Sequence, residues 1–101
     1  MSDDISILFD RIRLLLDREA AEHENGADTV EHTLTDGYAG ALALDGERLR
    51  TEERIRSLAG SDEHVGEVRI LKARLALLEE ELAQLRGLLG TLAGTLVKVR
   101  S

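Results

Sequence analysis

The sequence predicts an all-α protein of three helices, in which a long third helix carries a continuous line of leucines. Two observations lead to this prediction. The 101-residue chain has no proline, one phenylalanine, one tyrosine and 33% charged residues, which is typical of long helices and coiled coils. Its last third repeats apolar residues at alternating steps of three and four. A chain of this length forms one domain, so we expect 1–101 to be a single helical unit with segments 1–27, 28–60 and 61–101.

The first helix is predicted to cover about 3–24. Asp3 or Asp4 can cap it, because a carboxylate stabilises the positive N-terminal end of a helix. Apolar residues then recur three and four positions apart and form one face: Ile5, Leu8, Ile12 and Leu15. Phe9 and Leu16 widen this face, as contact with more than one neighbouring helix would require.

A hinge at 25–28 is predicted to separate the first helix from a second one at about 29–59. Its Asn-Gly pair tolerates the left-handed backbone that ends helices, and Asp28 with Glu31 forms a capping box. The apolar stripe of the second helix is less regular: Val30, Leu34, Tyr38, Ala41, Leu42, Leu49, Ile55 and Leu58.

The second helix also contains Gly37, Gly40 and Gly46, each of which costs a helix interior about 1 kcal/mol relative to Ala. We expect the small residues at 37, 40, 41 and 43 to let a neighbouring helix approach closely. A kink or ligand-facing notch, and a break in the helix, are the alternatives. Gly60 ends this helix and Ser61 or Asp62 caps the next, which implies an antiparallel hairpin.

The third helix, at about 62–100, gives the strongest pattern. Five uninterrupted heptads exceed the three or four that indicate a coiled coil, and a strict repeat of seven predicts left-handed supercoiling. The a and d positions form a seam of ten apolar residues, which we expect to be an oligomer interface: Val68, Leu71, Leu75, Leu78, Leu82, Leu85, Leu89, Leu92, Leu96 and Val99.

The charges beside this seam suggest how it pairs. In a parallel pair, three g and e positions would meet with opposite sign: Glu67 with Lys72, Arg74 with Glu79, and Glu81 with Arg86. We therefore expect parallel self-pairing of 68–100 in a dimeric helical bundle, with the first two helices on its flanks. The competing arrangement is a monomeric three-helix bundle with the seam turned inward, in which a first helix about 30 Å long leaves part of a third helix about 54 Å long bare.

Apolar residues also lie off the seam of the third helix, so it is expected to contact more than one neighbour: Ile70, Ala73, Leu77, Leu88 and Val97. The segment 87–97, GLLGTLAGTLV, has no charge and places Gly90 and Gly94 four residues apart. A buried helix contact is the favoured interpretation of this segment. The alternatives are a docking surface for another protein and membrane contact.

Charge and composition exclude several classes of function. A net charge of −7 disfavours binding to nucleic acid and to anionic membranes, and no apolar run approaches the roughly 20 residues that span a bilayer. The chain has no cysteine and begins with an acidic segment where a secretory signal would be basic. We therefore expect a cytoplasmic protein with no nucleic-acid or membrane partner.

No residue pattern predicts a catalytic, cofactor or metal site. None of the three histidines follows a glutamate by three positions, as the di-iron helical bundles require. The best candidate for a ligand surface is the segment 46–56, which contains Arg48, Arg50, Arg54 and Arg56. Interleaved acids favour a self-neutralised helix surface instead. We expect no enzyme, no cofactor and no metal.

Two resemblances bear on the fold. At 31–55, EHTLTDGYAGALALDGERLRTEERI, and more loosely to about residue 90, the chain resembles short actinobacterial helical-hairpin proteins without an established activity. It also partly resembles the helical-hairpin anti-sigma factors that bind cyclic di-GMP. Glu53 and Ser57 match their Glu-x3-Ser-x2-Arg-x3-Gln-x3-Asp motif, but Gly60, His64 and Val68 replace its Arg, Gln and Asp. The resemblance implies the architecture and carries over no nucleotide site.

These observations predict a non-enzymatic coiled-coil interaction module, an adaptor or regulator, that self-associates, most simply as a homodimer, and binds another protein. The alternative is a helical bundle of anti-sigma-like type that senses a nucleotide or a phosphorylated metabolite.

Overall fold

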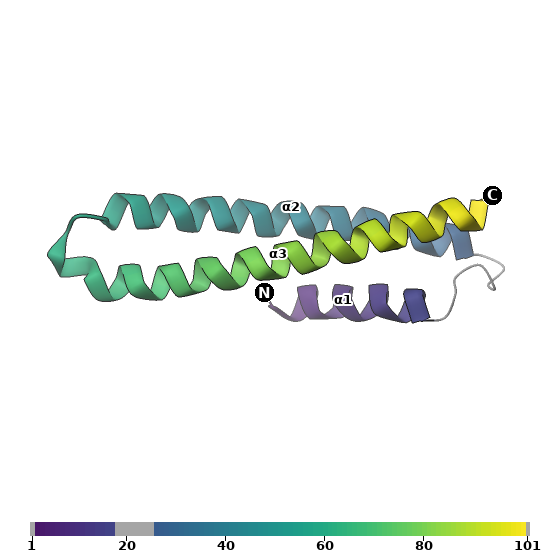
Figure 1. Cartoon of the computed structure of the whole chain (residues 1–101), viewed down its shortest axis with the longest axis horizontal. Coiled ribbons are helices and arrows are strands. Elements are labelled where there is room, and N and C mark those ends of the chain that lie inside the picture. The colour runs from purple at the N-terminus through teal and green to yellow at the C-terminus, as the bar shows by residue number, and fades with distance from the viewer. Residues whose placement is uncertain (1, 18–25, 101) are drawn as a thin grey trace.

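The computed structural model describes residues 2–17 and 26–100, and every regular element within these ranges is helical. Helix α1 spans Ser2–Asp17, α2 spans Gly26–Leu58, a 3-10 turn η2 spans Asp62–His64, and α3 spans Val65–Arg100. Helices α2 and α3 form a long antiparallel hairpin, and α1 lies along one half of it (Figure 1). The molecule measures 59 × 18 × 16 Å. The predicted all-α class with a long third helix is therefore confirmed.

The ends of the helices differ from the prediction in places. Helix α2 begins at Gly26, so Asp28 lies within its first turn, where its carboxylate favours the positive helix end, and does not form the cap. The predicted end of the first helix at 24 and the Asn25 stop lie outside the described residues. Gly60 has a φ of 91°, a left-handed conformation that suits glycine and ends α2 as predicted. Ser61 precedes η2 but makes no capping hydrogen bond with its side chain.

The hairpin is held together by a seam with the same register along its length. A Cβ atom at Gly37 would meet Leu89, Glu47 pairs with Arg74, and Arg54 pairs with Glu67. The step of seven residues from 47 to 54 on α2 thus matches the step of seven from 74 back to 67 on α3. Antiparallel helices that share a seven-residue repeat show this pattern. The residues of α2 that point into this seam are buried or half-buried: Val30, Leu34, Gly37, Ala41, Leu44, Arg48, Thr51, Ile55 and Leu58.

This register corrects the apolar stripe expected for α2. Tyr38, Leu42 and Leu49 are exposed, whereas Leu44 and Thr51 are buried. The stripe looked irregular in the sequence because glycine, arginine and threonine occupy some of its inward positions, so that hydrophobicity alone does not mark them.

Two glycines of α2 allow the three helices to come close, which confirms the expectation for positions 37 and 40. A side chain at Gly37 would collide with Leu89 of α3, and a Cβ at Gly40 would lie 2.8 Å from Cδ2 of Leu8 in α1. Ala41 is buried as well, but Ala43 is exposed. Helix α2 continues unbroken through this segment.

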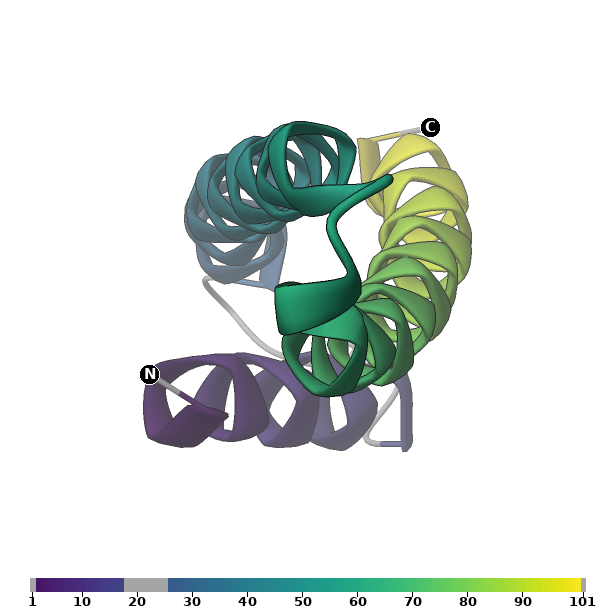
Figure 2. The same cartoon turned by 90° about the vertical axis from the view of Figure 1, so that its left-hand side faces the viewer.

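Helix α1 covers one side of the hairpin, against the first half of α2 and the second half of α3 (Figures 1 and 2). Its Leu8, Phe9 and Ile12 are buried in the same core as the α2–α3 seam. Full burial of such a side chain contributes about 1.5–3 kcal/mol, so these residues supply most of the attachment. Arg11 adds an ion pair with Asp36 at 3.0 Å and a hydrogen bond to the hydroxyl of Thr33 at 3.4 Å.

The two sides of the hairpin differ in what covers them. Thr33, Gly40, Glu47 and Arg54 are spaced by seven and lie on one side of α2. Helix α1 covers the first two, and the ion pairs to Arg74 and Glu67 cross the hairpin at the last two. Figure 2 shows α1 on this side only, which leaves the opposite side of the hairpin without a third helix.

The close approach at Gly37 can be tested by replacing it with alanine. We expect Gly37→Ala to lower the free energy of unfolding by about 1–2 kcal/mol, because Leu89 must shift to admit the methyl group. The matched control is Gly46→Ala in the same helix, whose Cβ would meet only a guanidinium nitrogen of Arg50 at 3.3 Å. This control should raise the free energy of unfolding by about 0.5–1 kcal/mol. Urea titration measures both, and equal stabilisation by both variants would contradict the packing described.

The antiparallel register can be tested by exchanging charges. Arg74→Glu should destabilise the protein, and Glu47→Arg should restore stability in the double variant, with a coupling energy of about 0.2–1 kcal/mol. Urea unfolding of the two single variants and the double variant gives this energy. Rescue of Arg74→Glu by Glu79→Arg, but not by Glu47→Arg, would instead support the parallel pairing that the sequence suggested.

Candidate protein-interaction surface

The leucine seam of α3 is largely occupied within the chain. Its central residues are buried against α2 and α1: Leu78, Leu82, Leu85, Leu89 and Leu92. Val68, Leu71, Leu75 and Leu96 are half-buried, and the side chain of Val99 lies outside the described residues. A second copy could reach the central leucines only if the hairpin opened. The structure thus has the inward-turned seam of the monomeric alternative, with half of the hairpin uncovered by α1.

The charges beside the seam are also used within the hairpin. Glu67 pairs with Arg54 at 3.2 Å and Arg74 with Glu47 at 3.4 Å. Arg86 lies 4.0 Å from Asp45 on the other side of the hairpin. One residue of each charge pair that was predicted to face a parallel partner thus contacts α2 of the same chain.

The four arginines of the candidate ligand surface do not converge. Arg48 is half-buried on the inward line of α2, and its guanidinium binds two residues of the same helix, Asp45 at 2.9 Å and Glu52 at 2.7 Å. The hydrogen bond to Asp45 is the main cause that raises the pKa of Arg48, and burial opposes it. Arg54 pairs with Glu67, and Arg56 pairs with Glu53 at 2.7 Å. Arg50 is exposed and lies on a different side of α2. The acids thus neutralise three of the four guanidinium groups.

Within 2–17 and 26–100, no group of three or more His, Asp or Glu side chains is arranged to hold a metal ion. None of the helices described is both long enough and apolar enough to cross a bilayer.

The uncharged segment 87–97 has two different faces. Leu89 and Leu92 are buried in the core, and Leu88 packs against it. Gly87, Gly90 and Gly94 are exposed, and a Cβ atom at any of them would meet nothing within 4 Å. Each glycine costs about 1 kcal/mol of helix stability relative to Ala, and no contact within the described chain offsets that cost. The expected buried contact is therefore found on one face of this segment only.

These glycines belong to a line of small residues along the exposed back of α3. Ala83, Gly87, Gly90, Gly94 and Val97 alternate steps of four and three, and all five are exposed. We call this line the α3 stripe. Val97, its largest member, is 69% exposed. The stripe runs parallel to the buried seam, on the outside of the hairpin.

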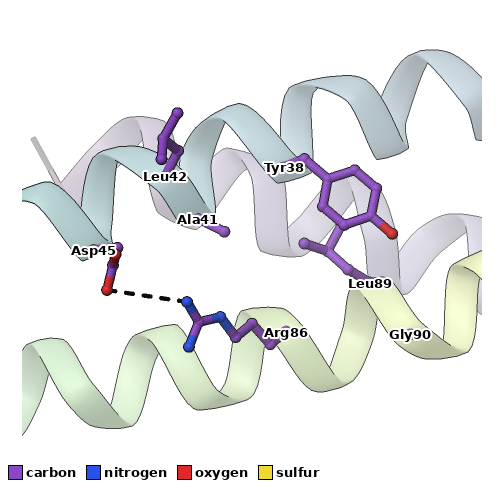
Figure 3. A pocket seen from close by; sticks show the side chains of 7 residues that line it. All are labelled: Tyr38, Ala41, Leu42, Asp45, Arg86, Leu89 and Gly90. Atoms are coloured by element: carbon purple, nitrogen blue, oxygen red, sulfur yellow. Dashed lines mark ion pairs between the residues drawn. The ribbon is translucent and has the colours of Figure 1, made fainter.

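A shallow groove adjoins the α3 stripe on the side of the hairpin that α1 leaves uncovered. Its volume is about 340 Å³, and we call it the outer groove. The residues that line it come from α2 and α3 (Figure 3): Tyr38, Ala41, Leu42, Asp45, Arg86, Leu89 and Gly90. Leu42 is 74% exposed and Tyr38 is 55% exposed, so two large apolar side chains stand at its α2 edge.

The charged groups of the outer groove lie at one end. Asp45 and Arg86 face each other there, as the dashed line in Figure 3 marks, and the remaining lining residues are uncharged. An apolar groove with one charged end and a stripe of small residues beside it suits an apolar helix face.

Sequence reasoning found part of this surface. The sequence shows the uncharged segment and the spacing of Gly90 and Gly94, and docking of another protein is one of the interpretations that this segment allows. The contribution of Tyr38 and Leu42 was missed, because both were assigned to the inward stripe of α2. The signal that could have separated them is the inward line Gly37, Ala41 and Leu44, which leaves positions 38 and 42 facing outwards.

No family model matches this chain, and no curated protein or solved structure matches it either. The residues of the outer groove and the α3 stripe are thus the features from which a function can be inferred.

Proposed function

We propose that this protein is a non-enzymatic helical interaction module, an adaptor or regulator of coiled-coil type, that self-associates and binds another protein. The outer groove and the α3 stripe form its binding surface. The observation that supports this proposal most is the segment 87–97, which remains uncharged on its exposed face after its leucines are buried. A helix face that contacted only water would ordinarily carry charged residues, so an exposed face without charge indicates a contact with another molecule.

The occupant that suits this surface is an amphipathic helix of a protein. Leu42, Tyr38 and Val97 offer apolar contacts at 74%, 55% and 69% exposure, and the glycines of the stripe let a helix backbone approach. The Asp45–Arg86 pair at one end can orient the bound helix through hydrogen bonds. A cysteine-free chain suits a reducing cytoplasm, which is the compartment we propose.

The test compares charged substitutions on and off this surface. Leu42→Glu and Val97→Glu should each weaken self-association or partner binding at least tenfold, about 1.4 kcal/mol, because a carboxylate would have to be desolvated in the contact. Both side chains are exposed, so circular dichroism should show an unchanged helix content. Sedimentation equilibrium measures self-association, and quantitative mass spectrometry of proteins captured from the source cells measures partner binding.

The matched control is Ile7→Glu on α1, where the original side chain is 58% exposed but lies away from the outer groove. This variant should assemble and capture proteins as the unmodified chain does. The proposal would be wrong if Ile7→Glu removed the captured proteins or the assembly while Leu42→Glu and Val97→Glu retained them.

A further inference from the structure

The α3 stripe has an approximate symmetry about its central residue. Ala83 and Val97 lie seven residues before and after Gly90, and Gly87 and Gly94 lie three before and four after it. If a second α3 packed against this line in the opposite direction, small residues of one helix would therefore face small residues of the other at the centre. At the two ends, Val97 would face an alanine. A surface with this property is complementary to a second copy of itself.

We infer that a second copy of the chain occupies this surface, with the two α3 helices antiparallel and Gly90 near the two-fold axis. This inference rests on the proposed function and identifies the partner in self-association. Val97 of each copy packs beside Ala83 of the other, and the glycines allow the two helix backbones to approach closely. Each α3 also enters the outer groove of the other copy, where Tyr38 and Leu42 extend the apolar contact.

Charge complementarity supports a second copy in this direction. Glu79 and Glu80 lie eleven and ten residues before Gly90, whereas Lys98 and Arg100 lie eight and ten residues after it. Antiparallel pairing about Gly90 places the acidic end of each stripe near the basic end of the other. Parallel pairing of the same surfaces would place acids beside acids and bases beside bases, which is unfavourable.

This arrangement leaves the seam and α1 undisturbed. The leucines of α3 stay buried against α2, and α1 lies on the side of the hairpin away from the outer groove. The contact ends where the partner helix ends, so the half of the hairpin near the η2 turn takes no part in it. Gly66 of α3, which is exposed there, lies outside the proposed contact.

Disulfide cross-linking tests the orientation, because the chain has no cysteine of its own. Ala83→Cys and Val97→Cys chains, mixed and oxidised, should form the 83–97 cross-linked dimer in at least tenfold excess over the 83–83 and 97–97 products. A disulfide requires Cα atoms about 4.4–6.8 Å apart, so only neighbouring positions react. Predominant 83–83 and 97–97 products would indicate parallel pairing and overturn the inference.

A second measurement tests the close approach of the glycines. Gly90→Ala and Gly94→Ala should raise the dissociation constant of the dimer at least tenfold in sedimentation equilibrium, whereas Gly66→Ala should leave it unchanged. All three should raise or preserve the melting temperature at concentrations where the protein is monomeric, since alanine favours the helix. A lower monomer melting temperature, or equal effects on dissociation at Gly66 and Gly90, would overturn the inference.

The two proposals can fail separately. If the protein has a monomeric mass at millimolar concentration and the 83–97 cross-link does not form, a second copy is not the occupant of this surface. If Leu42→Glu still releases captured proteins in that case, self-association is refuted, but the surface binds a different protein and the partner-binding part of the proposed function stands. If neither assembly nor capture depends on Leu42 and Val97, both proposals fail.

Discussion

The burial of the leucine seam of α3 is the constraint on which the rest of the structure depends. A line of leucines exposed on a single helix is unfavourable in water, so it must pack against another apolar helix surface. Helix α2 covers the seam along its length, and α1 covers half of the resulting hairpin. Gly37 and Gly40 make this possible, because larger residues would hold Leu89 and Leu8 away from α2. Gly37 and Gly40 are thus explained by the helices that approach them, whereas a Cβ atom at Gly46 would meet only Arg50 of α2 itself.

The half of the hairpin that α1 leaves bare is built differently from the covered half. Its inward positions include Arg48 and Thr51, and its ion pairs Glu47–Arg74 and Arg54–Glu67 cross between the helices. Arg48 and Thr51 bind groups of α2 itself, whereas the ion pairs from Glu47 and Arg54 fix which residues of α3 face them. The covered half supplies the large core, whereas the bare half adds a smaller apolar contact and the ion pairs between α2 and α3. The outer groove lies in the same lengthwise half of the hairpin as α1, but on the opposite side of it. The core beneath the groove is rich in leucine.

The sequence predicted the elements better than their pairing. Leucine at strict heptad positions marked the third helix, and Gly60 marked the turn, because both signals are local and depend on a single helix or a single φ angle. The partner of the seam could not be read in the same way. Opposite charges at Glu67, Arg74 and Arg86 fit a parallel copy as well as an antiparallel α2, since charge pairs identify a neighbour only after the register is known. The inward line of α2 contains glycine, arginine and threonine, which concealed that it repeats every seven residues.

The candidate surface was only partly predictable for the same reason. Gly90 and Gly94 were visible as a spacing, but whether they faced the core or the outside depended on where Leu89 and Leu92 pointed. Leu42 and Tyr38 became part of the surface only when Ala41 and Leu44 were found to point inwards. Exposure is a property of the assembled hairpin, and no local pattern in α3 alone determines it.

The central claim is that α2 of the same chain occupies the seam of α3. Spin labels on cysteines at Ala43 and Gln84, two exposed positions at the same level of the hairpin, test it directly. Helix axes in contact lie about 8–10 Å apart, so the doubly labelled chain should give one short distance. That distance should persist when the labelled chain is diluted into a large excess of unlabelled chain. Its loss on dilution, or a broad distribution of long distances, would show that the seam pairs between chains and would contradict the account.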